Sequence, residues 1–183
     1  MRRIILSLCI AFAAAAALSA QAPAPFAEKP ALLTSVGQSA DIEMVKVLLN
    51  RGKVNHTADP LVTAAKLSSD AKTLVLAVGG SSKGLGAAGI STEAEIERAK
   101  ALIKRARELG MKIIAVHVGG EARRGTLSDA FISLCVPASD YVIVVEDGDK
   151  DGLFTKLAGQ AKIPIVKVDK ITSAGAPLAA AFK

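Results

Sequence analysis

The sequence predicts an α/β fold: a three-layer αβα sandwich around a parallel sheet of five to six strands. Two observations carry this prediction. Short aliphatic runs alternate along the 183-residue chain with longer segments of helical periodicity, which is the pattern of repeated β-α units. The run 73–78, TLVLAV, has no polar alternation, as is typical of a strand covered by helices on both faces.

Each element can be placed in chain order from its apolar pattern. Consecutive aliphatic residues indicate strands, and apolar residues every three or four positions indicate amphipathic helices. Strands that alternate with helices predict right-handed crossovers between parallel strands. The expected strands are 31–36, 54–56, 73–78, 112–118, 141–145 and 163–168, and the expected helices are 39–51, 61–67, 92–109, 126–136, 153–160 and a terminal helix after 173.

Boundary residues support these helices. Gly52 ends the first helix, and Asp59 followed by Pro60 is a strong start for the second, with an N-cap and a proline at the first helical position. The charged residues of 93–108 are expected to form a solvated helix face. The other start and stop signals are the capping pairs Thr92 with Glu95 and Thr126 with Asp129, and the stops Gly110 and Pro137.

Three loops that follow strands are rich in glycine or polar residues: 34–39, 79–91 and 119–125. In the flavodoxin-like, Rossmann-like order 2-1-3-4-5 their strands are neighbours. The loops then form one crevice at the carboxyl edge of the sheet, where open α/β sheets bind ligands. The order 3-2-1-4-5-6 would separate the second of these loops from the third, so we predict the flavodoxin-like order.

The N-terminus has the plan of a secretory signal peptide over residues 1–22. Arg2 and Arg3 precede an apolar run that is too short to span a bilayer comfortably, and small residues follow it. Cleavage is therefore expected after Ala20 or Ala22, with export to the periplasm or secretion. An uncleaved N-terminal anchor is the alternative.

The mature chain is expected to hold one domain, 31–183, preceded by a proline-rich and disordered leader, 23–30. Its length of about 160 residues allows one sizeable core, and no transmembrane helix is expected in it. Cys9 leaves with the signal peptide and Cys135 remains alone, so no internal disulfide can form. Cys135 is expected to be a buried small hydrophobic residue.

The charge of the chain excludes nucleic acid as a partner. The formal charge of +6 includes the two arginines of the signal peptide, so the mature protein is only mildly basic. Its cationic residues are spread over helix faces, and with 3% aromatic residues it has no platform on which bases could stack.

The loop 79–91 contains a Gly-x-Gly-x-x-Gly pattern in the wrong context for a dinucleotide site. Such a site needs its first glycine at the strand end and an acidic residue closing the next strand, which here closes with His117-Val118. Lys83 is misplaced for a Walker loop. We expect a backbone cradle for phosphate or carboxylate, or a mobile lid, and a loop without a ligand is the alternative. The residues assigned to the cradle are Gly80, Ser81, Ser82, Lys83, Gly84 and Gly86.

The first loop, 34–39, partly resembles the flavodoxin phosphate loop, although Val36 replaces an expected hydroxyl. FMN is not expected, because tryptophan is absent and nothing obvious could stack on a flavin ring. Ser35 and Gln38 can still present donors to an anion at a helix start. Simple N-capping is the alternative.

The most reactive-looking cluster is His117 with Glu121, Arg123 and Arg124. An arginine pair can hold a carboxylate or phosphate in two-pronged fashion, and histidine exchanges a proton near neutrality. The alternatives are a packed strand histidine and a solvated turn. A hydrolase triad of a loop serine, His117 and Glu121 can be drawn, but it lacks the G-x-S-x-G elbow.

The acidic turn 147–152 matches the front half of an EF-hand calcium loop, with Asp147, Asp149 and Asp151 as the acids. Position twelve falls on Ala158, so the bidentate glutamate is missing. We expect no metal and no cofactor, with helix capping as the role of this turn and calcium as the alternative.

The three loops carry a resemblance to a known family. Thr34-Ser-Val-Gly-Gln-Ser39, the glycine-rich stretch 79–91, and His117-Val-Gly-Gly-Glu-Ala-Arg-Arg-Gly125 with Ser128-Asp129 are similar to an exported bacterial family known only as a domain of unknown function, number 6305. The resemblance covers nearly the whole mature chain. It implies export and a single intact domain, and it implies no reaction.

The function predicted from the sequence is an exported protein that binds a small anionic solute, a carboxylate or phosphate, in the crevice of the three loops. A membrane transporter or sensor is a possible partner, with no residue assigned to it. One alternative is a hydrolase or transferase that uses His117 and Glu121. The other is a protein interaction module without a small ligand.

Overall fold

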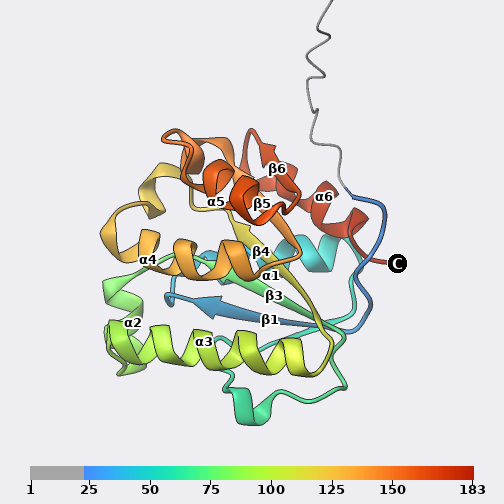
Figure 1. Ribbon diagram of the computed structural model, residues 1–183, viewed down its shortest axis with the longest axis horizontal. Helices are drawn as coiled ribbons and strands as arrows, with labels where there is room; N and C mark the ends of the chain where they lie inside the picture. The colour runs from blue at the N-terminus through green and yellow to red at the C-terminus, as the bar shows by residue number, and fades with distance from the viewer. Residues whose placement is uncertain (1–22) are drawn as a thin grey trace, which may run out of the picture.

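The computed structural model describes residues 23–183, so the expected signal peptide, 1–22, lies outside the described residues. Six parallel strands form one sheet in the order β2-β1-β3-β4-β5-β6, which confirms the predicted order and adds β6 at its edge (Figure 1). The strands are β1 (Ala31–Val36), β2 (His56–Ala58), β3 (Thr73–Val78), β4 (Lys112–His117), β5 (Tyr141–Val145) and β6 (Ile165–Val168).

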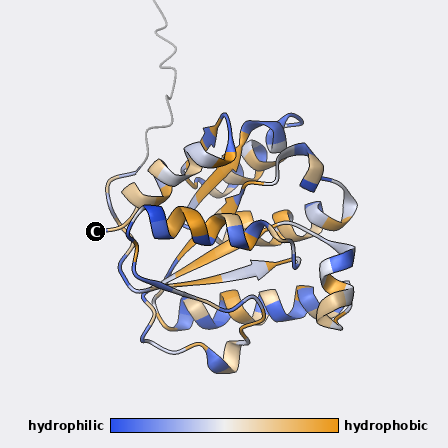
Figure 2. Cartoon of the chain, turned by 180° about the vertical axis from the view of Figure 1, so that it is seen from behind, coloured by the Kyte–Doolittle hydropathy of each residue, from blue (hydrophilic) through white to orange (hydrophobic). Residues whose placement is uncertain are grey.

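Helices cover both faces of the sheet, which confirms the three-layer sandwich. One core cluster joins the sheet to α3, α4 and α5, and a second joins it to α1 and α6. Figure 2 shows the apolar strands enclosed between helices whose outer faces are hydrophilic. The helices are α1 (Asp41–Arg51), α2 (Ser82–Ala88), α3 (Thr92–Glu108), α4 (Thr126–Cys135), α5 (Leu153–Ala161) and α6 (Gly175–Ala180).

The central strands form where expected because they are buried on both faces. All six residues of β1 and of β3 are buried, as are all five of β5. Their registers bring the strand ends level, with Val36 opposite Val78 and His117 opposite Val144. The loops after β1, β3 and β4 therefore start side by side at the carboxyl edge.

The prediction of a helix after Pro60 is wrong. The segment holds only the short 3-10 helix η1 (Ala64–Lys66), and β2 is shifted by two residues from 54–56. The Asp59 side chain accepts a hydrogen bond from Leu61 N at 3.0 Å, which closes a local turn instead of opening a helix. The Asp59 amide N–H donates to Leu33 O and so continues the pairing of β2 with β1.

The glycine-rich segment is not a loop throughout, because residues 82–88 form α2. Ser81 caps this helix by accepting from Gly84 N at 3.1 Å, and Gly89 ends it with φ of 67°. The cap of α3 is also one residue earlier than predicted: Ser91 accepts from Ala94 N, so Thr92 is the first helical residue.

The segment before β1 differs from the disordered leader that the sequence predicts, because its last residues are fixed to the domain. Phe26 N and Ala27 N donate to Ala181 O, and Ala27 is fully buried. The Glu28 backbone exchanges two hydrogen bonds with the Thr73 hydroxyl. This strap, residues 26–28, ties both ends of the folded chain together at the amino edge of the sheet. None of the helices in residues 23–183 is long and apolar enough to cross a bilayer.

Candidate functional site

The loops after β1, β3 and β4 meet at the carboxyl edge. Gln38 and Gly80 form an isolated antiparallel bridge, and Ser81 N donates to Gly37 O at 2.8 Å. Gly80 N donates to Ser128 Oγ at 2.9 Å, which fixes the same loop to α4. The juxtaposition on which the anion-binding hypothesis depends is therefore present in the fold.

This close approach depends on glycine. Gly37 has φ of 97°, and a Cβ on it would lie 2.5 Å from Gly79 O. A Cβ on Gly84 would lie 1.8 Å from Gln38 O. Gly84 is thus a packing residue where α2 meets the first loop, whereas no atom lies within 4 Å of the position that a Cβ on Gly86 would occupy.

An ion pair inside the molecule holds the first loop in place. Glu95 of α3 is fully buried, and its Oε1 accepts from Gly37 N at 2.9 Å and from Gln38 Nε2 at 3.0 Å. Arg98 binds Glu95 Oε2 through Nε at 2.7 Å and donates through Nη2 to Ser35 O. The two charges neutralise each other while each satisfies a backbone group of the loop.

The expectation that the charges of 93–108 face solvent fails at this pair. Glu95 lies on the same helical stripe as Ala99, Leu102 and Ala106, which are buried. The spacing of four, three and four residues from Glu95 to Ala106 could have revealed the burial of Glu95 from the sequence. A glutamate on an apolar helix stripe must find a partner inside the protein.

An open groove of about 420 Å³ runs between the loop after β3 and the segment before α4. Its charged side chains are Lys83, Arg123 and Arg124, and no carboxylate lines it. The remaining lining residues are Gly80, Ser81, Ser82, Ala122, Gly125, Thr126, Leu127 and Ser128. Six of the predicted ligand residues, Gly80, Ser81, Ser82, Lys83, Arg123 and Arg124, thus line one groove.

Most of the amides expected to form an anion cradle are already used. The amides of Gly80, Ser81 and Gly84 have partners in the protein, as described above. The amides of Ser82 and Lys83 have no acceptor within residues 23–183, and the same holds for Thr126 and Leu127 at the start of α4. These groups are the donors that the groove can offer.

Arg124 is not free to bind a ligand as predicted. It makes a two-pronged ion pair with Asp151 and donates through Nε to Asp129 Oδ1 at 2.8 Å. It also donates to Gly148 O, and its guanidinium lies 5.8 Å from the ring centre of Phe154. The hydrogen bonds to Asp151 and Asp129 raise its pKa further above the usual value. Arg124 joins the turn before α5 to the start of α4.

His117 is placed for packing. It is 1% exposed, its Nδ1 lies 2.8 Å from Val78 O, and its Nε2 lies 3.3 Å from Gly120 O. Burial lowers its pKa below the usual value, although the two carbonyls favour the charged ring. Glu121 is exposed and pairs with Lys150 at 2.7 Å, so no hydrogen bond joins it to His117 within the described chain.

The first loop contributes little to the groove. The Ser35 hydroxyl is fully buried and has no hydrogen-bond partner among the described residues. Gln38 directs its amide to Glu95 Oε1 and Pro60 O. Ser35 and Gln38 therefore shape and support the crevice without lining the groove.

The acids of the turn 147–152 point to different partners. Asp149 is buried, caps α5 through Phe154 N at 2.7 Å and pairs with Lys167 at 2.7 Å. Asp147 pairs with Lys150, and Asp151 with Arg124. No cluster of three metal-ligating side chains occurs in residues 23–183. The turn acts as the predicted helix cap.

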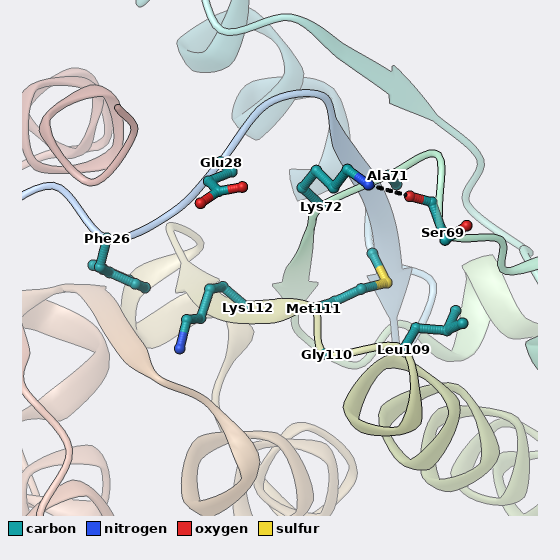
Figure 3. A pocket seen from close by; sticks show the side chains of 9 residues that line it. All are labelled: Phe26, Glu28, Ser69, Ala71, Lys72, Leu109, Gly110, Met111 and Lys112. Carbon is teal, nitrogen blue, oxygen red and sulfur yellow. Dashed lines mark hydrogen bonds between the residues drawn. The ribbon is translucent and has the colours of Figure 1, made fainter.

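A different hollow, of about 140 Å³, lies at the opposite, amino edge of the sheet (Figure 3). Lys72 points across it and donates to Ser69 O at 2.8 Å, and Lys112 and Glu28 lie on its rim. None of the three loops that the sequence singled out lines this hollow, so we do not regard it as the candidate site.

Comparisons with known proteins give one family match and two distant structural likenesses. The family model described as domain of unknown function, DUF6305, matches residues 28–182. No curated protein matches the sequence significantly. Among solved structures, a GDSL-like lipase from Bacteroides thetaiotaomicron VPI-5482 has a TM-score of 0.35 at 10% identity over 75% of this chain, which spans 66% of the lipase. The psychrotrophic esterase EstA from Pseudoalteromonas sp. has a TM-score of 0.32 at 10% identity, over 76% of this chain and 78% of the esterase. Scores this low carry no argument about activity.

Proposed function

Because the chain belongs to DUF6305, a family whose function is unknown, we propose a function from the chemistry of the groove: binding of a small oxyanion, a carboxylate or phosphate. The observation that carries this proposal is the charge balance of the lining. No carboxylate lines the groove, and of its three cationic residues Arg124 is paired with Asp129 and Asp151, which leaves Lys83 and Arg123. The hydroxyls of Ser82 and Thr126 and the free amides described above are further donors.

The proposal includes export, based on the pattern of residues 1–22. An exported protein of this class meets its solute outside the cytoplasm. Expression of the full chain in a Gram-negative host tests this part: we expect the protein in the periplasmic fraction with a new N-terminus at Gln21 or Pro23. A full-length protein retained with the cytoplasm would contradict it.

Lys83 and Arg123 are the cations that can respond to a ligand. Lys83 is exposed and has no ion-pair partner within residues 23–183, and Arg123 has one distant contact, with Asp41. A planar guanidinium binds a carboxylate or phosphate through parallel hydrogen bonds, and a lysine adds a point charge. The groove is open and has no aromatic lining residue, so it suits a small hydrophilic anion better than an extended ring system.

The geometry gives less support to a hydrolase or transferase. His117 is enclosed between two backbone carbonyls, and Glu121 is held at the surface by Lys150. A general base needs a nucleophile or substrate proton within hydrogen-bond reach, and no hydroxyl bonds to His117 in the described chain. Binding therefore explains the site better than catalysis.

Calorimetric titration with inorganic phosphate, acetate and succinate tests the binding proposal. We expect heat from at least one of these probes, with affinity that falls as salt rises. Replacing Arg123 by Ala should weaken binding by roughly tenfold or more, and Lys83→Ala by a few-fold, since hydrogen bonds to charged groups contribute roughly 1.5–3 kcal/mol.

The matched control is Lys104→Ala, which removes the same charge from an exposed position on α3 outside the groove. It should leave affinity unchanged. No heat from any probe with the wild-type protein and the Asp41→Asn variant introduced below, or equal losses in Lys104→Ala and Lys83→Ala, would contradict the proposal.

A further inference from the structure

The two adjacent arginines of the groove have opposite surroundings. Arg124 is only 12% exposed and is held by two carboxylates and a carbonyl. The Arg123 side chain is 35% exposed, and its one ion contact joins Nε to Asp41 Oδ1 at 3.6 Å, too long for a hydrogen bond. Its two terminal nitrogens have no hydrogen-bond partner within residues 23–183. One arginine is fixed, and its neighbour is loosely held.

Asp41 is itself incompletely satisfied. It is the first residue of α1, its side chain is 15% exposed, and its Oδ2 is buried without a hydrogen-bond donor among the described residues. The positions that a Cβ would occupy on Gly79 and Gly119 lie 3.4 Å and 2.5 Å from this oxygen. Asp41 thus sits in the crevice between the loops after β3 and β4, with Arg123 as its counter-charge.

Gly119 makes this arrangement possible. Its φ is −76°, so its backbone does not need a glycine. A Cβ at this position would instead lie 2.1 Å from Arg123 Cγ and 2.5 Å from Asp41 Oδ2. The missing side chain leaves the space in which Arg123 folds back across the chain to reach Asp41. A glycine at this position therefore serves the contact between two side chains.

We propose that Asp41 and Arg123 form a latch that regulates the anion site. In the free protein, Asp41 holds Arg123 across Gly119. An oxyanion entering the groove competes with Asp41 for the guanidinium and draws it outward, using the two terminal nitrogens that the resting contact leaves unpaired. The latch rests on the proposed function, because it assigns the cation that the anion recruits and the internal carboxylate that opposes it.

The energies are compatible with a latch that opens. An ion pair with a partly exposed arginine and no hydrogen bond changes a binding constant by about fivefold or less, whereas hydrogen bonds between a guanidinium and an incoming anion contribute more. Asp41 should therefore weaken anion binding without preventing it. By the same reasoning, Arg124 cannot be recruited, because moving it would leave Asp129 and Asp151 without their counter-charge.

Titration of the intact protein with inorganic phosphate tests the latch in Asp41→Asn and Gly119→Ala. We expect Asp41→Asn to bind phosphate roughly twofold to fivefold more tightly, because the variant lacks the weak ion pair that competes with the anion for Arg123. Gly119→Ala should also tighten binding, because the methyl group displaces Arg123 from its resting position. The control, Glu43→Gln, removes an exposed acid from the same turn of α1 and should change little.

A second measurement needs no ligand. The Nε–Hε signal of Arg123 in a ¹⁵N correlation spectrum, identified by its loss in Arg123→Lys, should shift in Asp41→Asn and, in the wild type, on addition of phosphate. An unchanged signal in Asp41→Asn would overturn the latch, and so would equal or weaker phosphate affinity in that variant while the wild type still binds. If neither wild type nor Asp41→Asn binds phosphate or the carboxylates, the proposed function itself fails. A shift of the Arg123 signal in Asp41→Asn would then still establish the resting contact.

Discussion

Different interactions stabilise the amino and the carboxyl edge of the sheet. At the amino edge, the strap 26–28 is fixed by backbone hydrogen bonds and by the neutral hydroxyl of Thr73. The carboxylates there, such as Asp140, keep contact with solvent. At the carboxyl edge, Glu95 and Asp149 are fully buried as charged partners of Arg98 and Lys167.

The difference shows where the fold needs a defined loop shape. A buried ion pair adds little net stability, because desolvation of both charges offsets their attraction. Its effect is instead to orient the groups around it, since a buried charge tolerates few arrangements. The edge that carries the candidate site is the one built this way, and the three predictions below perturb the two edges in turn.

The largest effect is expected for Glu95→Ala at the carboxyl edge. The change removes the acceptor of Gly37 N and one of the two acceptors of the Gln38 amide, and it leaves the charge of Arg98 with carbonyl partners alone. The free energy of unfolding should therefore fall by roughly 3–5 kcal/mol. Urea denaturation measures it. The matched control is Glu97→Ala on the same helix, where the glutamate is exposed and the change should stay within about 0.5 kcal/mol. Similar losses in both variants would contradict the comparison of buried and exposed charges.

A smaller, pH-dependent effect is expected for Asp149→Asn. Burial alone would raise the pKa of Asp149, but hydrogen bonds from Lys167 and Thr155 lower it below its usual value. The ionised form therefore stabilises the folded protein above the unfolded pKa near 3.8, and this stability is lost as the pH falls through the folded pKa.

Asp149→Asn should cost roughly 1.5–3 kcal/mol near neutral pH and flatten the acid limb of a plot of unfolding free energy against pH. The control is Asp147→Asn in the same turn, where the acid is exposed and both effects should be small. An acid limb as steep in Asp149→Asn as in the wild type would sink this prediction.

The smallest effect is expected at the amino edge, for Tyr141→Phe. The Tyr141 hydroxyl is buried without a partner among the described residues, so its removal should change stability by no more than about 0.5 kcal/mol near pH 7, in either direction. Burial raises the pKa of Tyr141 to about 12.

The unfolded chain ionises its tyrosine near pH 10, so the wild type should lose stability as the pH rises from about 10 to about 12. Tyr141→Phe should lose less over that range, as measured by urea denaturation at pH 8 and pH 11. A loss of stability near pH 7 well above 1 kcal/mol would show that the hydroxyl has a partner.

Most of the sheet could be predicted because local pattern and tertiary environment agree. The strands 31–36, 73–78 and 141–145 form with the predicted bounds, since a strand buried on both faces has no polar position to obscure its limits. The segment after Asp59 shows the opposite case: a strong local start signal is outweighed because its backbone continues the edge pairing of β2 and its apolar residues Val62 and Leu67 pack beneath the sheet.

The candidate site could be located but not specified. The glycine and polar residues that follow three strands predicted its location, because the strand order brings the three loops together at one edge of the sheet. Which side chains remain available was decided by partners distant in sequence. Asp151 binds Arg124, Asp41 lies beside Arg123, and Lys150 holds Glu121 away from His117.

The sequence by itself determined the elements, the layers and the edge at which the functional loops gather, because hydrophobic periodicity and glycine positions act over a few residues and report burial directly. Only the tertiary structure decided how the charges are shared. Arg123 meets Asp41, and Arg124 meets Asp151, across more than twenty positions of sequence, so two neighbouring arginines with the same chemistry are distinguished by the carboxylates that the fold places around each of them.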